Sequence, residues 1–90
     1  MENHVTLEQL RKRIDRLDER LLRLLNTRGR LALCVGRIKK RQGKRLFDPA
    51  RERVVLRQVL KANPGPLSTR AVRAIYREIL KQIRRLEQSA

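Results

Sequence analysis

The sequence predicts an all-α protein of three helices, one long, one short and one of medium length. Two observations carry this prediction. Aliphatic residues recur at alternating spacings of three and four, the pattern of helices that pack against other helices. Aromatic residues, prolines and glycines are scarce, since the 90 residues include one Phe, one Tyr, three Pro and four Gly. We expect one domain over residues 1–90, and because so short a chain can bury little apolar area, we expect a second copy to complete the fold.

The first helix is expected over residues 6–41, after a short tail. Thr6 and Gln9 have the spacing of a capping box, which marks a helix start. Nine of the ten positions in its main stripe are aliphatic, and the stripe consists of Leu7, Leu10, Ile14, Leu17, Leu21, Leu24, Arg28, Leu31, Val35 and Ile38. We interpret Gly29 and Gly36 as points where a neighbouring helix approaches closely. Such a helix is ~54 Å long, so the rest of the chain cannot cover it on every side.

The second helix is expected over residues 49–62, after a turn at residues 42–45. Asp48 would cap this helix, and Pro49 would occupy its first position. Its apolar residues are Val54, Val55, Val59 and Leu60.

The third helix is expected over residues 68–88. The Asn-Pro-Gly-Pro run at residues 63–66 is the strongest breaker in the chain, and Ser68 can cap the helix that follows. The stripe that we expect to be buried is Val72, Ile75, Tyr76, Ile79, Leu80, Ile83 and Leu86.

The formal net charge of +15 raises the question of an anionic partner. Nucleic acid, anionic membranes and small acidic substrates are the classes to consider. Many arginines of the first helix lie three or four residues from an acid, no aromatic residues interleave with them, and no zinc-finger or helix-turn-helix spacing occurs. We therefore expect a solvated basic face, and neither nucleic acid nor a membrane as a partner.

The sequence also predicts a cytoplasmic protein. No apolar run approaches the ~18 residues that cross a bilayer, and the N-terminus lacks a hydrophobic signal core. The single cysteine, Cys34, excludes an internal disulfide and fits a reducing compartment.

Several chemistries have no support in the sequence. A nucleophilic triad needs a histidine base, and the one histidine, His4, lies in the tail at residues 1–5. We interpret Cys34 as a small packing residue. No Cys/His cluster has metal-ligand spacing, so we expect no metal. Gly43-Lys44 lacks the other residues of a phosphate loop.

Arg28 is the one cation within the aliphatic stripe of the first helix. A buried guanidinium without a partner costs several kcal/mol, so either the fold or a ligand must supply an anion. Lys39 is eleven residues further on, close to three full turns and ~16 Å along the axis. Arg11 is ~42 Å from Lys39 on the same helix, but an antiparallel partner would bring its own Arg11 closer. The alternatives are a structural ion pair for Arg28 and plain surface charge for the other two.

Two further groups complete the candidate site. Asp48, Arg51 and Glu52 share a face of the second helix's first turn, where a helix cap with local ion pairs is the simpler explanation. Glu87 continues the apolar stripe of the third helix instead of facing water, unless the last turn is frayed.

Four motifs in this order support a family assignment. Residues 10–18 read LRKRIDRLD, residues 24–28 read LLNTR, residues 35–39 read VGRIK and residues 48–52 read DPARE. They resemble the L-R-x-x-I-D-x-L-D, L-L-x-x-R, V-G-x-x-K and D-x-x-R-E motifs of the all-helical (AroQ) class of chorismate mutase, and the resemblance covers nearly the whole chain.

The resemblance implies an intertwined antiparallel helical homodimer with two sites, each using Arg11 from one subunit and the remaining residues from the other. The arginines matching Arg11 and Arg28 hold the substrate's two carboxylates. The match of Lys39 binds a carboxylate and the ether oxygen. The remaining roles fall on the second and third helices: Asp48 and Glu52 bind the ring hydroxyl, Arg51 supports carboxylate binding, Ile83 contacts the substrate, and Glu87 hydrogen-bonds the ether oxygen.

The implied reaction is the pericyclic (Claisen) rearrangement of chorismate to prephenate, an isomerisation in phenylalanine and tyrosine biosynthesis that needs no nucleophile, metal or cofactor. The site would fold the substrate and stabilise the charge that develops on the ether oxygen, with Lys39, Glu87 and Arg28 as the catalytic residues. A carboxylate would repel that charge, so Glu87 must be protonated to donate.

Three alternatives stay open at this point. An isochorismate pyruvate lyase of the same fold would use similar cations, a basic helical nucleic-acid-binding dimer would use the excess Arg and Lys, and a dimerisation module would use Arg28 only in an ion pair. We expect no fused dehydratase, dehydrogenase or regulatory domain within ninety residues. Docking to another shikimate-pathway enzyme is left open.

Overall fold

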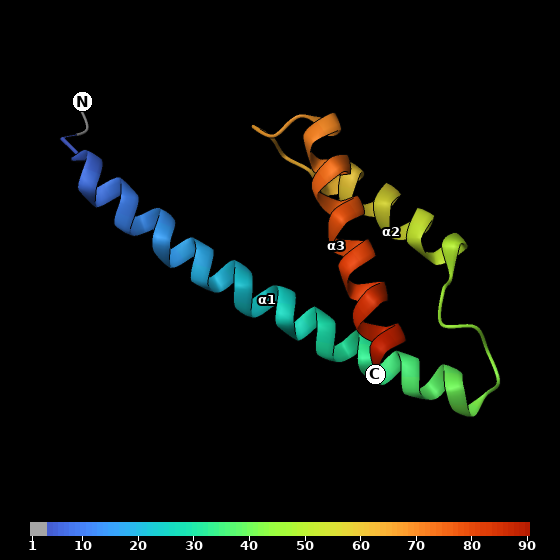
Figure 1. Cartoon of the computed structure of the whole chain (residues 1–90). Helices are drawn as coiled ribbons and strands as arrows, with labels where there is room; N and C mark the ends of the chain where they lie inside the picture. Colours follow the sequence, from blue (N-terminus) through green and yellow to red (C-terminus); the bar gives the residue numbers. More distant parts are fainter. Residues whose placement is uncertain (1–3) are drawn as a thin grey trace. The chain divides into compact units, whose positions relative to one another are not determined.

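Three helices make up the fold in the computed structural model, which describes residues 4–90 (Figure 1). Helix α1 spans Leu7–Arg41, α2 spans Pro49–Ala62 and α3 spans Thr69–Ser89, and residues 4–90 contain no strand. The predicted helices are confirmed to within one residue at each end. Residues 1–3 of the predicted tail lie outside the described residues.

The contacts divide the chain into two compact units, and the boundary falls inside α1. One unit ends at Leu31 and the other spans Ala32–Ala90. The second unit contains the last turns of α1 together with α2 and α3. None of the described helices is long and apolar enough to cross a membrane.

The two ends of α1 are closed by local hydrogen bonds. At the start, the backbone N–H of Thr6 donates to Gln9 Oε1 at 2.9 Å and the N–H of Gln9 donates to Thr6 Oγ1 at 3.1 Å, which confirms the capping box. At the end, the N–H of Lys44 donates to the carbonyl of Lys39 at 2.8 Å and that of Gly43 to the carbonyl of Lys40 at 3.2 Å. These two bonds form a Schellman motif, in which Gly43 has a φ of +67°.

The caps predicted for α2 and α3 are also confirmed. Asp48 Oδ1 accepts from the backbone N–H of Arg51 at 3.0 Å, and Pro49 is the first residue of α2. Ser68 Oγ accepts from the N–H of Ala71 at 3.1 Å. Each bond satisfies one of the backbone donors that a helix start leaves open.

The core of the second unit is small and lies where α2 packs against α3. Leu80 on α3 is buried, whereas α2 has no buried residue. Two residues of the stripe predicted to be buried on α3 are exposed instead, Ile75 at 49% and Leu86 at 40%. The prediction was wrong for these two because α2 covers only one side of α3.

The aliphatic stripe of α1, by contrast, is exposed along its whole length. Its nine aliphatic side chains are between 43% and 65% exposed: Leu7, Leu10, Ile14, Leu17, Leu21, Leu24, Leu31, Val35 and Ile38. An apolar stripe of this length is far larger than the scattered apolar residues normal on a protein surface, and it marks an interaction surface.

Replacing Gly43 with alanine should destabilise the fold by about 1 kcal/mol, because an L-residue at positive φ is strained. Gly36→Ala is the matched control. A Cβ added at Gly36 would meet Glu87 Oε2 and Leu46 Cδ2 at 3.6 Å, which is ordinary van der Waals contact. Thermal unfolding of the two variants checks the prediction, and equal melting temperatures would contradict it.

Candidate active site

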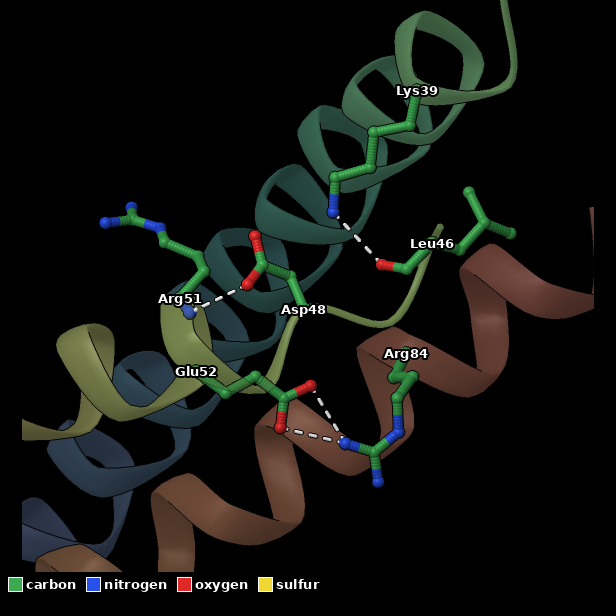
Figure 2. Close-up of polar contacts among 6 residues, drawn as sticks. All are labelled: Lys39, Leu46, Asp48, Arg51, Glu52 and Arg84. Atoms are coloured by element: carbon green, nitrogen blue, oxygen red, sulfur yellow. Dashed lines mark hydrogen bonds and ion pairs between the residues drawn. The ribbon is translucent and has the colours of Figure 1, made fainter. Parts of the chain in front are cut away.

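Lys39 links the end of α1 to the segment that leads into α2. Its Nζ donates a hydrogen bond of 3.0 Å to the carbonyl of Leu46, and the contact is partly buried (Figure 2). An ammonium group has three N–H donors, and this bond uses one of them. The bond therefore restrains the position of the positive charge at the end of α1.

Asp48 and Arg51 are connected by a hydrogen bond between the Asp48 side chain and the Arg51 backbone. The cap bond from the Arg51 N–H to Asp48 Oδ1 confirms the simpler explanation of Asp48 as a helix cap. Arg51 is exposed, and Figure 2 shows its guanidinium directed away from Glu52. The capping bond orients the Asp48 carboxylate at the start of α2.

Glu52 pairs with α3 and not with a neighbour on its own helix. Arg84 Nη1 lies 2.8 Å from both Oε1 and Oε2 of Glu52 (Figure 2). The guanidinium of Arg84 also lies over the ring of Phe47, 4.5 Å from its centroid, which is a cation–π distance. The local ion pair expected in the first turn of α2 is thus replaced by an ion pair between two helices.

Arg84 is the residue that sequence reasoning missed. The sequence feature that could have identified Arg84 is its helical position. It follows the buried Leu80 by four residues and so lies on the side of α3 that meets α2. In a chain with 24 Lys and Arg, that position did not distinguish it from the other cations.

Glu87 lies on the side of α3 that meets the last turns of α1. Its Oε2 is buried, and a Cβ built on Gly36 would lie 3.6 Å from that atom. The helix continues to Ser89, so Glu87 belongs to an ordered turn. The prediction that Glu87 continues the apolar stripe is confirmed, as is the prediction that a neighbouring helix approaches α1 at Gly36.

A cleft of about 160 Å³ adjoins this carboxyl group, lined by Leu33, Gly36, Arg37, Lys40, Glu87 and Ala90. A larger one of about 380 Å³ lies between α2 and α3, and half of its lining residues are cations: Pro49, Glu52, Arg53, Leu56, Arg77, Leu80, Lys81 and Arg84. Four cations against one carboxylate favour an anion over a cation as the ligand.

The predicted site residues are divided between the two units. Lys39, Asp48, Arg51, Glu52, Ile83 and Glu87 all belong to Ala32–Ala90, and Ile83 is half-buried on α3. Arg11 and Arg28 belong to the unit that ends at Leu31, where Arg11 is exposed and Arg28 half-buried.

Fold and site together define a class, an all-helical protein whose candidate site is built from fixed cations and carboxylates at helix ends. Within that class, the chain belongs to the chorismate mutase type II family, whose model matches residues 10–88.

Proteins similar to this chain support the family assignment, because their names include chorismate mutase. The chain is 41% identical over 85 residues to the bifunctional chorismate mutase/prephenate dehydratase of Aquifex aeolicus and 39% identical over 87 residues to that of Pseudomonas aeruginosa. These matches cover 90% and 91% of this chain but 24% of each relative, so the chain spans about a quarter of their length. A solved structure of chorismate mutase (form II) from Thermus thermophilus matches with a TM-score of 0.89 and 38% identity, over 91% of this chain and 93% of that one.

Proposed function

We propose that this protein is a chorismate mutase, an isomerase that rearranges chorismate to prephenate in aromatic amino acid biosynthesis. The observation that carries the proposal is the family match over residues 10–88, which includes every predicted site residue. The geometry supports it, because Lys39, Glu52 and Glu87 belong to one compact unit and each is at least partly shielded from water.

The proposed reaction requires a site that positions the substrate and stabilises developing charge, and this site can supply both. A unimolecular rearrangement is accelerated when the substrate is held in its reactive conformation and when fixed donors meet the charge that develops. Lys39 would meet the ether oxygen and a carboxylate with the donors that its bond to Leu46 leaves available. Because that bond holds the ammonium in place beforehand, little reorganisation accompanies the reaction.

The start of α2 would bind the other end of the substrate. Asp48 and Glu52 would accept a hydrogen bond from the ring hydroxyl, and Arg51 would support carboxylate binding. Ile83 would contact the substrate through apolar atoms. The carboxylate of Glu52 keeps lone pairs beyond those used by Arg84, so the ion pair leaves it able to accept.

The complete site is proposed to need two chains. The exposed stripe of α1 would be buried in an antiparallel homodimer, in which Arg11 of the partner joins Arg28 in holding the two carboxylates. Burial of the nine aliphatic side chains would be the driving force, and because each is 43–65% exposed in the single chain, its gain is about half of the ~1.5–3 kcal/mol for a fully buried side chain.

A cytoplasmic location is part of the proposal. The thiol of Cys34 is exposed and free, which suits a reducing compartment. Neither a metal, a cofactor, a membrane nor a nucleic acid takes part in the proposed reaction.

Incubation of the purified protein with chorismate should produce prephenate, and Lys39→Ala should lower kcat about 10²–10³-fold because a fixed donor to the ether oxygen is lost. Lys44→Ala, which changes an exposed lysine of the following turn, is the control and should keep full activity. Absence of prephenate would contradict the proposal, and release of pyruvate from isochorismate instead would favour the lyase.

Mixing two inactive variants should restore activity if the sites are shared. Arg11→Ala and Lys39→Ala each disable both sites of a homodimer, but a mixed dimer has one site with both residues intact. After unfolding and refolding together in equal amounts, about a quarter of all sites should be active. If the refolded mixture stays inactive, although size-exclusion chromatography shows that both variants form dimers, a site shared in this way would be ruled out.

Glu87 should make the activity depend on pH. Its carboxyl can donate to the ether oxygen only when protonated. We expect kcat to fall as the pH rises and Glu87→Gln to flatten the profile, because an amide donates at every pH. A profile of kcat against pH that is the same in both proteins would refute this role.

A further inference from the structure

Arg84 joins three parts of the second unit at one point. Its Nη1 contacts both carboxylate oxygens of Glu52 at 2.8 Å, and its guanidinium lies 4.5 Å from the ring centroid of Phe47 (Figure 2). The contacts connect α3 with the first turn of α2 and with the segment before α2. We propose that Arg84 is a positioning residue, which holds the Glu52 carboxylate in the direction needed to accept the substrate's ring hydroxyl. This role rests on the proposed function.

The geometry restricts Glu52 without using up its acceptors. A free glutamate side chain turns about three bonds, whereas contact of both oxygens with Arg84 Nη1 restricts the direction in which the carboxylate points. An ionised carboxylate has about four lone-pair positions, and Arg84 occupies two of them. A bound hydroxyl can therefore donate to a carboxylate that is already oriented.

Arg84 is itself held in place. The planar guanidinium lies over the Phe47 ring, and an arginine suits this position better than a lysine because it combines a flat cation with directed N–H groups. The side chains of Arg84 and Glu52 are 28% and 27% exposed. An ion pair at this exposure adds little to stability, so its main consequence is the direction of the Glu52 carboxylate.

The proposal predicts which kinetic constant changes. The ring hydroxyl keeps its own bonds during the rearrangement, so we expect a hydrogen bond to it in both the ground state and the transition state. Loss of such a uniform interaction raises KM and leaves kcat nearly unchanged. It should also affect only substrates that carry the hydroxyl.

The experiment compares Arg84→Met and Arg84→Lys with Arg85→Met, a matched control that removes the neighbouring exposed arginine of α3. Each full-length protein is assayed with chorismate and with the analogue that lacks the ring hydroxyl, as KM or, where turnover is slow, as the inhibition constant. We expect Arg84→Met to raise KM for chorismate about tenfold, with no change for the analogue. Arg84→Lys should recover part of the loss, and Arg85→Met should resemble the wild type.

A second arm tests the connection to Glu52. In a Glu52→Ala background, Arg84→Met should cause no further rise in KM for chorismate, because the group that it positions is gone. Thermal unfolding of each variant separates loss of fold from loss of positioning.

The outcomes separate this role from the proposed function. If Arg84→Met raised KM equally for chorismate and the analogue, or left KM for chorismate unchanged, the positioning role of Arg84 would be overturned. Turnover of chorismate by the wild-type protein would still support the proposed mutase activity. A wild-type protein that does not rearrange chorismate would overturn both.

Discussion

The exposed apolar stripe of α1 is the constraint on which the rest of the structure depends. Nine aliphatic side chains along a helix of 35 residues are open to water in the single chain. The core that this chain builds alone is small, with Leu80 the one buried hydrophobic residue among those described. Such a core contributes little against the loss of conformational entropy on folding. In the proposed homodimer, burial of the α1 stripe would add the apolar area that this core lacks, and folding would be coupled to assembly.

The same stripe also explains why a ligand site belongs on it. A cation on an apolar seam is costly when the seam is buried, unless an anion accompanies it. Arg28 meets this condition if a dianionic substrate binds where the seam closes. The proposed dimer and the proposed site then support each other, because the surface that excludes water from the aliphatic residues also strengthens each charge contact within it.

Local structure could be predicted from the sequence, whereas the side-chain partners across helices could not. The caps at Thr6, Asp48 and Ser68 depend on residues three positions apart, so the sequence contains all the information. The partner of Glu52 lies 32 residues away on α3, and its identity follows from how two helices pack. Likewise, exposure of Ile75 and Leu86 depends on which side of α3 is covered by α2, and periodicity does not specify this.

The polar contacts of the site share one physical feature, namely that charged groups are held by parts of the fold before any ligand arrives. The Leu46 carbonyl holds Lys39, the helix start holds Asp48, and Arg84 holds Glu52. In the proposed reaction, which uses no nucleophile or cofactor, the rate would depend on how little these charges must move when the substrate changes shape. The short segment between α1 and α2 is therefore as important as the helices, since Leu46 contacts Lys39, Phe47 contacts Arg84, and Asp48 is itself one of the charged groups.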